Sequence, residues 1–108
     1  LELLMVYLVA CVAAPVVEEI AFRGILYRYL RDVTGRMGFI ASFGASALFS
    51  SVVFAAIHPQ GLVFIPVLSA LAVAFCIGRE WRGSLVSPMV AHALNNAVTI
   101  TLGTMLLG

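Results

Sequence analysis

Charged side chains are scarce in this sequence. Only 10% of the 108 residues are charged, 63% are hydrophobic, and the mean hydropathy is +1.13. Soluble globular domains carry roughly 25% charged residues. The composition therefore excludes a soluble domain and indicates an integral membrane protein.

Lysine is absent, and the six basic residues are all arginines. They form no basic stripe of the length that nucleic-acid binding requires, so we expect no nucleic-acid partner. Five of them follow the first and third apolar segments, at positions 28, 31, 36, 79 and 82. By the positive-inside rule, the loops after those segments face the cytoplasm, and the turn "HPQG" (58–61) faces the other side. The compact loops favour a bacterial cytoplasmic membrane.

Motifs for nucleophiles and metals are also missing. Cys11 and Cys76 lie in apolar runs without a CxxC partner, so we expect them to pack as reduced thiols. Ser50 and Ser51 lie in the small-residue run "ASFGASALFSS" (41–51), which we expect to form a helix face that packs closely on its neighbours. No GxSxG motif is present. A serine or cysteine nucleophile is therefore not indicated.

Long uncharged runs dominate the sequence instead. They cover residues 3–17, 39–57, 62–78 and 84–108. Each run with its flanks approaches the roughly 20 residues that a helix needs to cross about 30 Å of hydrocarbon. Period-2 alternation is absent, which excludes barrel strands. We predict an all-α, polytopic membrane helical bundle with four transmembrane helices, at about 2–30, 38–58, 61–79 and 84–107.

The connections between these helices are predicted to be short. The segments "RDVTGRMG" (31–38) and "GREWRGS" (78–84) have the glycine and charge content of exposed turns, with Trp81 as an interfacial anchor. The last helix is expected to begin at Ser84 or, for its regular part, at Ser87 as N-cap with Pro88 at the first position.

Seven polar side chains lie inside the predicted spans: Glu18, Glu19, Arg23, His58, His92, Asn95 and Asn96. Ionisable groups at membrane depth are costly, face the protein interior and mark function by default. For any one of them alone, a salt bridge that only fixes helix packing is an equally good explanation. Their spacing helps to separate the two explanations.

The first group contains two adjacent carboxylates and an arginine. Glu19 and Arg23 have i,i+4 spacing with the acid first, which favours an ion pair on one helix face. Glu18 lies about 100° around the helix, over Phe22, and cannot share that face. We therefore predict that one carboxylate is paired and the other is free to react.

The same i,i+4 spacing occurs twice more. "FAAIH" places Phe54 one turn from His58, and "HALNN" places His92 one turn from Asn96. Asn95 is expected to turn away from that face and to be structural. Three helices would thus each present polar groups to a common interior.

Such a set of groups suits the hydrolysis of a carbonyl compound. A carboxylate with an imidazole nearby can take a proton from water, and a second imidazole with an amide can donate to a developing oxyanion. A zinc site is the main alternative, because glutamate and histidine are zinc ligands. The HExxH spacing of zinc proteases is absent, however.

Three motifs carry a family resemblance: "EEIAFR" fits EExxxR, "FAAIH" fits FxxxH, and "HALNN" fits HxxxN, in that order. Together they resemble the CPBP family of intramembrane proteases, also called the Abi or CAAX-protease-like family, which includes the CAAX prenyl endopeptidase. The resemblance extends from Glu18 to Asn96. It implies that residues 1–108 form the core of a larger intramembrane protease, and the chain indeed begins without an initiator Met.

The resemblance also implies an activity, an intramembrane endopeptidase that uses a glutamate-activated water. Glu18 and His58 would activate the water, while His92 and Asn96 would hold the oxyanion. The supporting residues would be Glu19, Arg23 and Phe54. The family resemblance implies no metal and no other cofactor. The expected partners are membrane lipid and a peptide or protein substrate, lipidated or not.

Two other functions stay open. A non-catalytic membrane scaffold or bacteriocin self-immunity protein could keep the polar cluster for packing alone. A subunit of a proton-coupled transporter could use glutamate and histidine as a relay. The transporter is disfavoured because no pair of helices broken by glycine or proline is present.

A single catalytic site requires that its side chains lie close together in the fold. We expect Glu18, His58, His92 and Asn96 to converge on one pocket, with the carboxylate and imidazoles about 3–6 Å apart. At 1.5 Å per residue, His58 lies roughly 30 Å along its helix, near the far face of the membrane. The second helix must therefore start late, around Ser42, or be strongly tilted.

Overall fold

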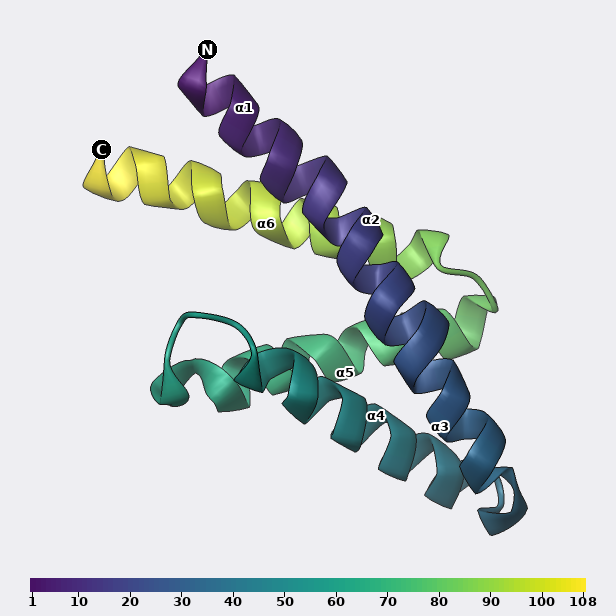
Figure 1. Cartoon of the computed structure of the whole chain (residues 1–108). Helices are drawn as coiled ribbons and strands as arrows, with labels where there is room; N and C mark the ends of the chain where they lie inside the picture. Colours follow the sequence, from purple (N-terminus) through teal and green to yellow (C-terminus); the bar gives the residue numbers. More distant parts are fainter.

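A computed structural model describes all 108 residues as helices joined by short turns, with no strand (Figure 1). Four helical stretches are long and apolar enough to cross a membrane, which confirms the predicted fold class. The elements are α1 (Glu2–Leu8), η1 (Val9–Ala13), α2 (Ala14–Glu19), η2 (Ile20–Leu26), α3 (Tyr27–Thr34), η3 (Gly35–Met37), α4 (Phe39–Ala56), η4 (Leu62–Phe64), α5 (Ile65–Arg82) and α6 (Val86–Leu107).

The first helix is longer than predicted. It runs from Glu2 to Met37, so the expected end near residue 30 and the exposed turn over 31–38 are wrong. Arg31 has a partner on another helix, because its guanidinium donates to Glu80 of α5. The turn itself is confined to Gly38, whose φ of 86° suits glycine.

Both later helix boundaries also differ from the prediction. The α5 helix continues to Arg82 and ends at Gly83, whose φ of 62° is left-handed, so most of the predicted 78–84 turn is helical. The α6 helix begins at Val86, whose N–H donates to the Ser84 hydroxyl at 3.1 Å. The N-cap is Leu85, which makes no side-chain cap bond. The expectation of Ser87 as N-cap with Pro88 at the first position is therefore wrong, and the alternative start near Ser84 is closer.

The long first helix runs diagonally across the molecule, and the other three long helices pack against it (Figure 1). α6 packs along its N-terminal half, against η1 and α2, and the α4–α5 hairpin packs along its C-terminal half. Near the free ends, the hydroxyls of Tyr7 and Thr101 are 2.7 Å apart. The two halves of the molecule therefore meet at the middle of the first helix, where Glu18 and Glu19 lie.

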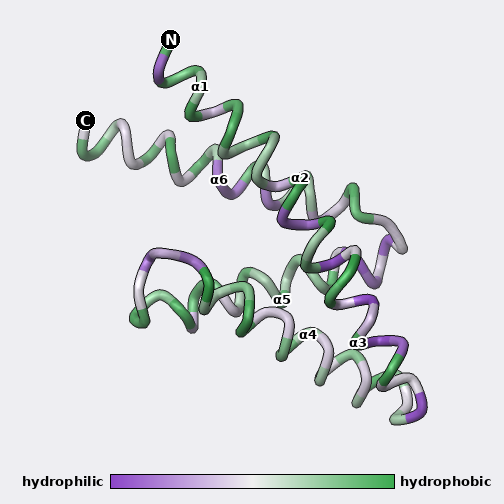
Figure 2. Tube along the Cα trace, in the orientation of Figure 1, coloured by the Kyte–Doolittle hydropathy of each residue, from purple (hydrophilic) through white to green (hydrophobic).

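Small residues allow the close packing of α4, as the sequence predicted. The buried residues of its small-residue face are Ser42, Ser46, Ala47, Ser50 and Ser51. α4 starts at Phe39, so the late start near Ser42 is wrong. Figure 2 shows hydrophobic residues along most of the trace, with hydrophilic segments at the middle and end of the first helix.

Candidate active site

Three separate elements carry the predicted site residues. Glu18 and Glu19 end α2, between the π-helical segments η1 and η2, and π segments are often found at functional sites. His58 follows the end of α4, and His92 and Asn96 lie within α6. The structure brings Glu18, His58, His92 and Asn96 to one cavity of about 400 Å³.

The Glu18 carboxylate lies between the two imidazoles. Its Oε1 is 3.6 Å from Nε2 of His58, and its Oε2 is 3.1 Å from Nε2 of His92. Both distances lie within the predicted range. The Glu18 side chain is 30% exposed, against 5% for that of His92, so the carboxylate is the more accessible of the two from the cavity.

The backbone of α4 sets the orientation of the His58 ring. Its Nδ1 is 2.5 Å from the carbonyl oxygen of Phe54, one turn earlier in the chain. Because a carbonyl only accepts, Nδ1 must carry the hydrogen, and in the neutral ring Nε2 then presents its lone pair on the Glu18 side. The Phe54 ring also packs on the imidazole, with centroids 4.1 Å apart.

His92 is held by a carboxylate at each ring nitrogen. Nδ1 is 2.9 Å from Oε1 of Glu19, on the side opposite Glu18. Both contacts are hydrogen bonds at the same time only if both nitrogens carry hydrogens or if one of the two carboxylates is protonated. The Phe75 ring stacks on the imidazole at 4.9 Å. His92 is therefore the most rigidly oriented group of the site.

The predicted ion pair of Glu19 and Arg23 is confirmed. Nη1 of Arg23 is 3.3 Å from Oε1 of Glu19, and the two side chains are 1% and 0% exposed. Arg23 also donates to the carbonyl of Ala72 at 2.9 Å. Its guanidinium lies 4.8 Å from the Phe54 ring centroid and 5.1 Å from that of Phe75. The pair thus connects the first helix, α4 and α5 beneath the reactive groups.

Asn96 has a structural bond in addition to its place at the cavity. Its side-chain nitrogen donates to the carbonyl of Ala10 at 2.7 Å. In the π-helical register a carbonyl accepts from the N–H five residues later, which for Ala10 is Pro15, and proline has no N–H. The Asn96 amide therefore supplies the hydrogen-bond donor that Pro15 cannot offer to the Ala10 carbonyl. One hydrogen of the amide remains available.

The prediction that Asn95 turns away from the site is wrong. It lines the same cavity as His92, Asn96 and Thr99. These positions are i, i+3, i+4 and i+7, which share one helix face. The prediction rested on the i+4 spacing of His92 and Asn96 alone and left out the i+3 neighbour.

Two groups that support the cluster could not be predicted from residue patterns. Phe75 lies in an apolar span and belongs to no motif, yet its ring contacts both His92 and Arg23. The carbonyl of Ala72 is a backbone group that no residue pattern reveals. Both lie on α5, the one long helix that contributes no motif.

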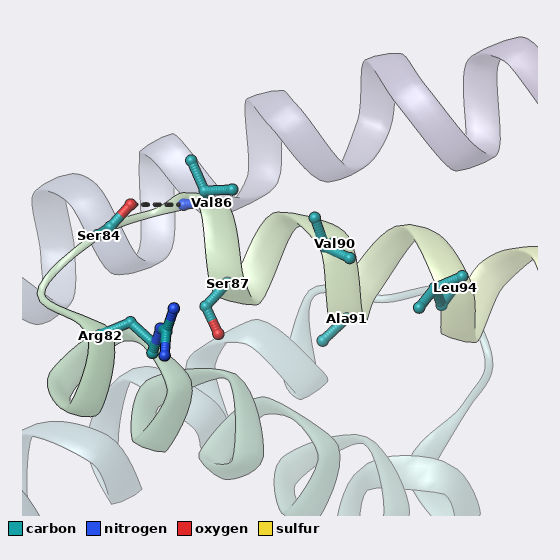
Figure 3. Close-up of a pocket in the computed structure, with 7 residues that line it drawn as sticks. All are labelled: Arg82, Ser84, Val86, Ser87, Val90, Ala91 and Leu94. Carbon is teal, nitrogen blue, oxygen red and sulfur yellow. Dashed lines mark hydrogen bonds between the residues drawn. The ribbon is translucent and has the colours of Figure 1, made fainter.

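The pocket with the largest volume is not the one that contains Glu18. A pocket of about 560 Å³ opens at the α5–α6 turn, lined by Arg82, Ser84, Val86, Ser87, Val90, Ala91 and Leu94 (Figure 3). It contains no carboxylate and no imidazole, and the Ser84 hydroxyl is bonded to the helix start. The smaller cavity at Glu18 is therefore the better candidate for chemistry.

The family of the chain follows from one comparison. Residues 1–98 match the family model described as type II CAAX prenyl endopeptidase Rce1-like. Comparisons with curated proteins and with solved structures found no match. The matched range includes the whole polar cluster and all three motifs, so the resemblance inferred from those motifs is confirmed. The chain belongs to the Rce1-like family of type II CAAX prenyl endopeptidases.

Proposed function

We propose that this integral membrane protein, a CAAX-protease-type endopeptidase by family, hydrolyses a peptide bond with a water activated by Glu18. The observation that supports this most is the placement of one partly exposed carboxylate between two imidazoles from different helices, at 3.6 and 3.1 Å. A carboxylate and an imidazole around one water are the groups that general-base catalysis uses.

In the proposed reaction, a water in the cavity hydrogen-bonds to both Glu18 and Nε2 of His58. As the water oxygen attacks the carbonyl carbon, Glu18 takes its proton and His58 accepts or shares the hydrogen bond. The carbonyl oxygen becomes an oxyanion. The proton then passes to the leaving nitrogen, the C–N bond breaks, and a new carboxylate and a new amine are formed.

The oxyanion is proposed to bind His92 and Asn96. His92 is fixed by Glu19, so its Nε2 needs little rearrangement to donate to the developing charge. Asn96 offers its second amide hydrogen, because only one is used by Ala10. Glu19 and Arg23 act as positioning residues for His92.

The substrate is proposed to be a membrane-associated peptide or protein, lipidated or not, reached from the lipid phase. We further propose a bacterial cytoplasmic membrane, with the Gly38 and Gly83 turns on the cytoplasmic side. The arginines near those turns support this orientation.

Incubation of the purified full-length protein with a library of tagged membrane peptides tests the proposal. Mass spectrometry should find a cleaved peptide bond with the parent protein and none with Glu18→Gln, whose amide cannot accept the proton. Glu2→Gln is the matched control, because Glu2 is exposed at the far end of the first helix. Equal cleavage by Glu18→Gln would leave the scaffold interpretation as the better one.

A further inference from the structure

Two side-chain amides at the cavity have no partner within the protein. Gln60, in the turn after α4, and Asn95, on α6, both line the cavity that holds Glu18. Neither side-chain amide makes a hydrogen bond to another group of the chain. Thr99 contacts only the backbone carbonyl of Asn95, at 2.8 Å.

The other polar side chains of the cavity are all engaged. They make the contacts described above and are Glu18, His58, His92, Asn96 and Thr99. Gln60 is exposed and Asn95 is partly buried, and each side-chain amide keeps two donor hydrogens and a carbonyl acceptor free for a ligand. Two free amides on one cavity therefore point to a ligand with both donors and acceptors.

Gln60 and Asn95 also flank the imidazoles. Gln60 follows His58 by two residues, and Asn95 follows His92 by three, on the same face of α6. The apolar part of the lining comes mainly from η4 and α5 and includes Phe64, Val67, Leu68 and Leu71. The cavity thus combines polar groups near the imidazoles with an apolar lining mainly from η4 and α5.

A peptide that is to be cleaved in a membrane has the matching chemistry. Its bond is accessible only in an extended segment, whose N–H and C=O groups have lost their helical partners. In hydrocarbon such groups must find partners in protein.

We propose that Gln60 and Asn95 are substrate-binding residues that pair with the backbone N–H and C=O groups on the two sides of the scissile bond, while the apolar lining receives the substrate side chains. This rests on the proposed function. Because the amides bind the backbone, they hold an extended segment whatever its side chains are.

The test compares Asn95→Leu and Gln60→Met, which keep size and remove hydrogen bonding, with Thr99→Val as the matched control from the same cavity. Each amide variant should raise the KM of a cleaved peptide about tenfold and leave kcat within about twofold, because binding to ground state and transition state is lost equally. Thr99→Val should keep the parent KM. Unfolding temperatures of all variants should match that of the parent.

A substrate variant separates direct binding from a structural effect. N-methylation of the amides beside the scissile bond should weaken binding to the parent, with no further loss in Asn95→Leu/Gln60→Met, because the same hydrogen bonds are removed. Parent KM values in both amide variants, or full additivity of the two losses, would overturn this inference. A kcat of Glu18→Gln near that of the parent would instead overturn the proposed function, so the two failures are distinguishable.

Discussion

Replacement of Glu19 by glutamine should destabilise the protein strongly. The substitution keeps the shape of the side chain but leaves the Arg23 guanidinium, 1% exposed, without its carboxylate 3.3 Å away. Removal of one partner of a buried ion pair costs about 3–5 kcal/mol. His92 then faces a neutral amide in place of the carboxylate at Nδ1, so turnover should fall as well.

The assay is the free energy of unfolding in detergent micelles, titrated with a denaturing detergent. Glu2→Gln, an exposed carboxylate on the same helix, should unfold like the parent. The double variant Glu19→Gln/Arg23→Met should recover most of the lost stability, because it removes both buried charges. A Glu19→Gln protein as stable as the parent, or a double variant less stable than the single one, would refute the reasoning.

Three further predictions concern other parts of the structure. Asn96→Leu leaves the Ala10 carbonyl without a donor and should lower the free energy of unfolding by about 1 kcal/mol; denaturation that coincides with the parent's would contradict this. Gly44→Ala, in open space within α4, should raise the free energy of unfolding by about 0.5–1 kcal/mol. Gly78→Ala should bring no such gain, because its Cβ would lie 3.0 Å from the Ser87 hydroxyl. Equal gains in thermal stability for the two variants would contradict close packing between α5 and α6. Prolonged treatment with a strong chelator should leave turnover intact, because the zinc spacing HExxH is absent; loss of activity that zinc restores would make Glu18 and the imidazoles ligands.

The sequence predicted the fold class and the pairing of Glu19 with Arg23 because both depend on strong, local signals. Uncharged runs of membrane length identify helices without reference to their neighbours. The spacing of Glu19 and Arg23 fixes their pairing within one helix. The buried small residues of α4 follow from composition alone.

The deviations arise where a distant group decides the local structure. Arg31 lies in a helix and donates to Glu80, far along the chain, so charge content alone wrongly predicted a turn. The Asn96 bond depends on a π-helical register that no residue pattern announces, with a proline five residues after Ala10. Phe75 stacks on His92 through helix packing.

A kinetic double-mutant cycle on Glu18 and His58 tests the central claim most directly. If both groups act on one water, Glu18→Gln and His58→Gln should each reduce kcat by about 10²–10⁴-fold. The double variant should then be no slower than the slower single variant, within a few-fold, because groups that act as a unit are not additive. Losses that multiply in the double variant, or a kcat near that of the parent in either single variant, would contradict the account.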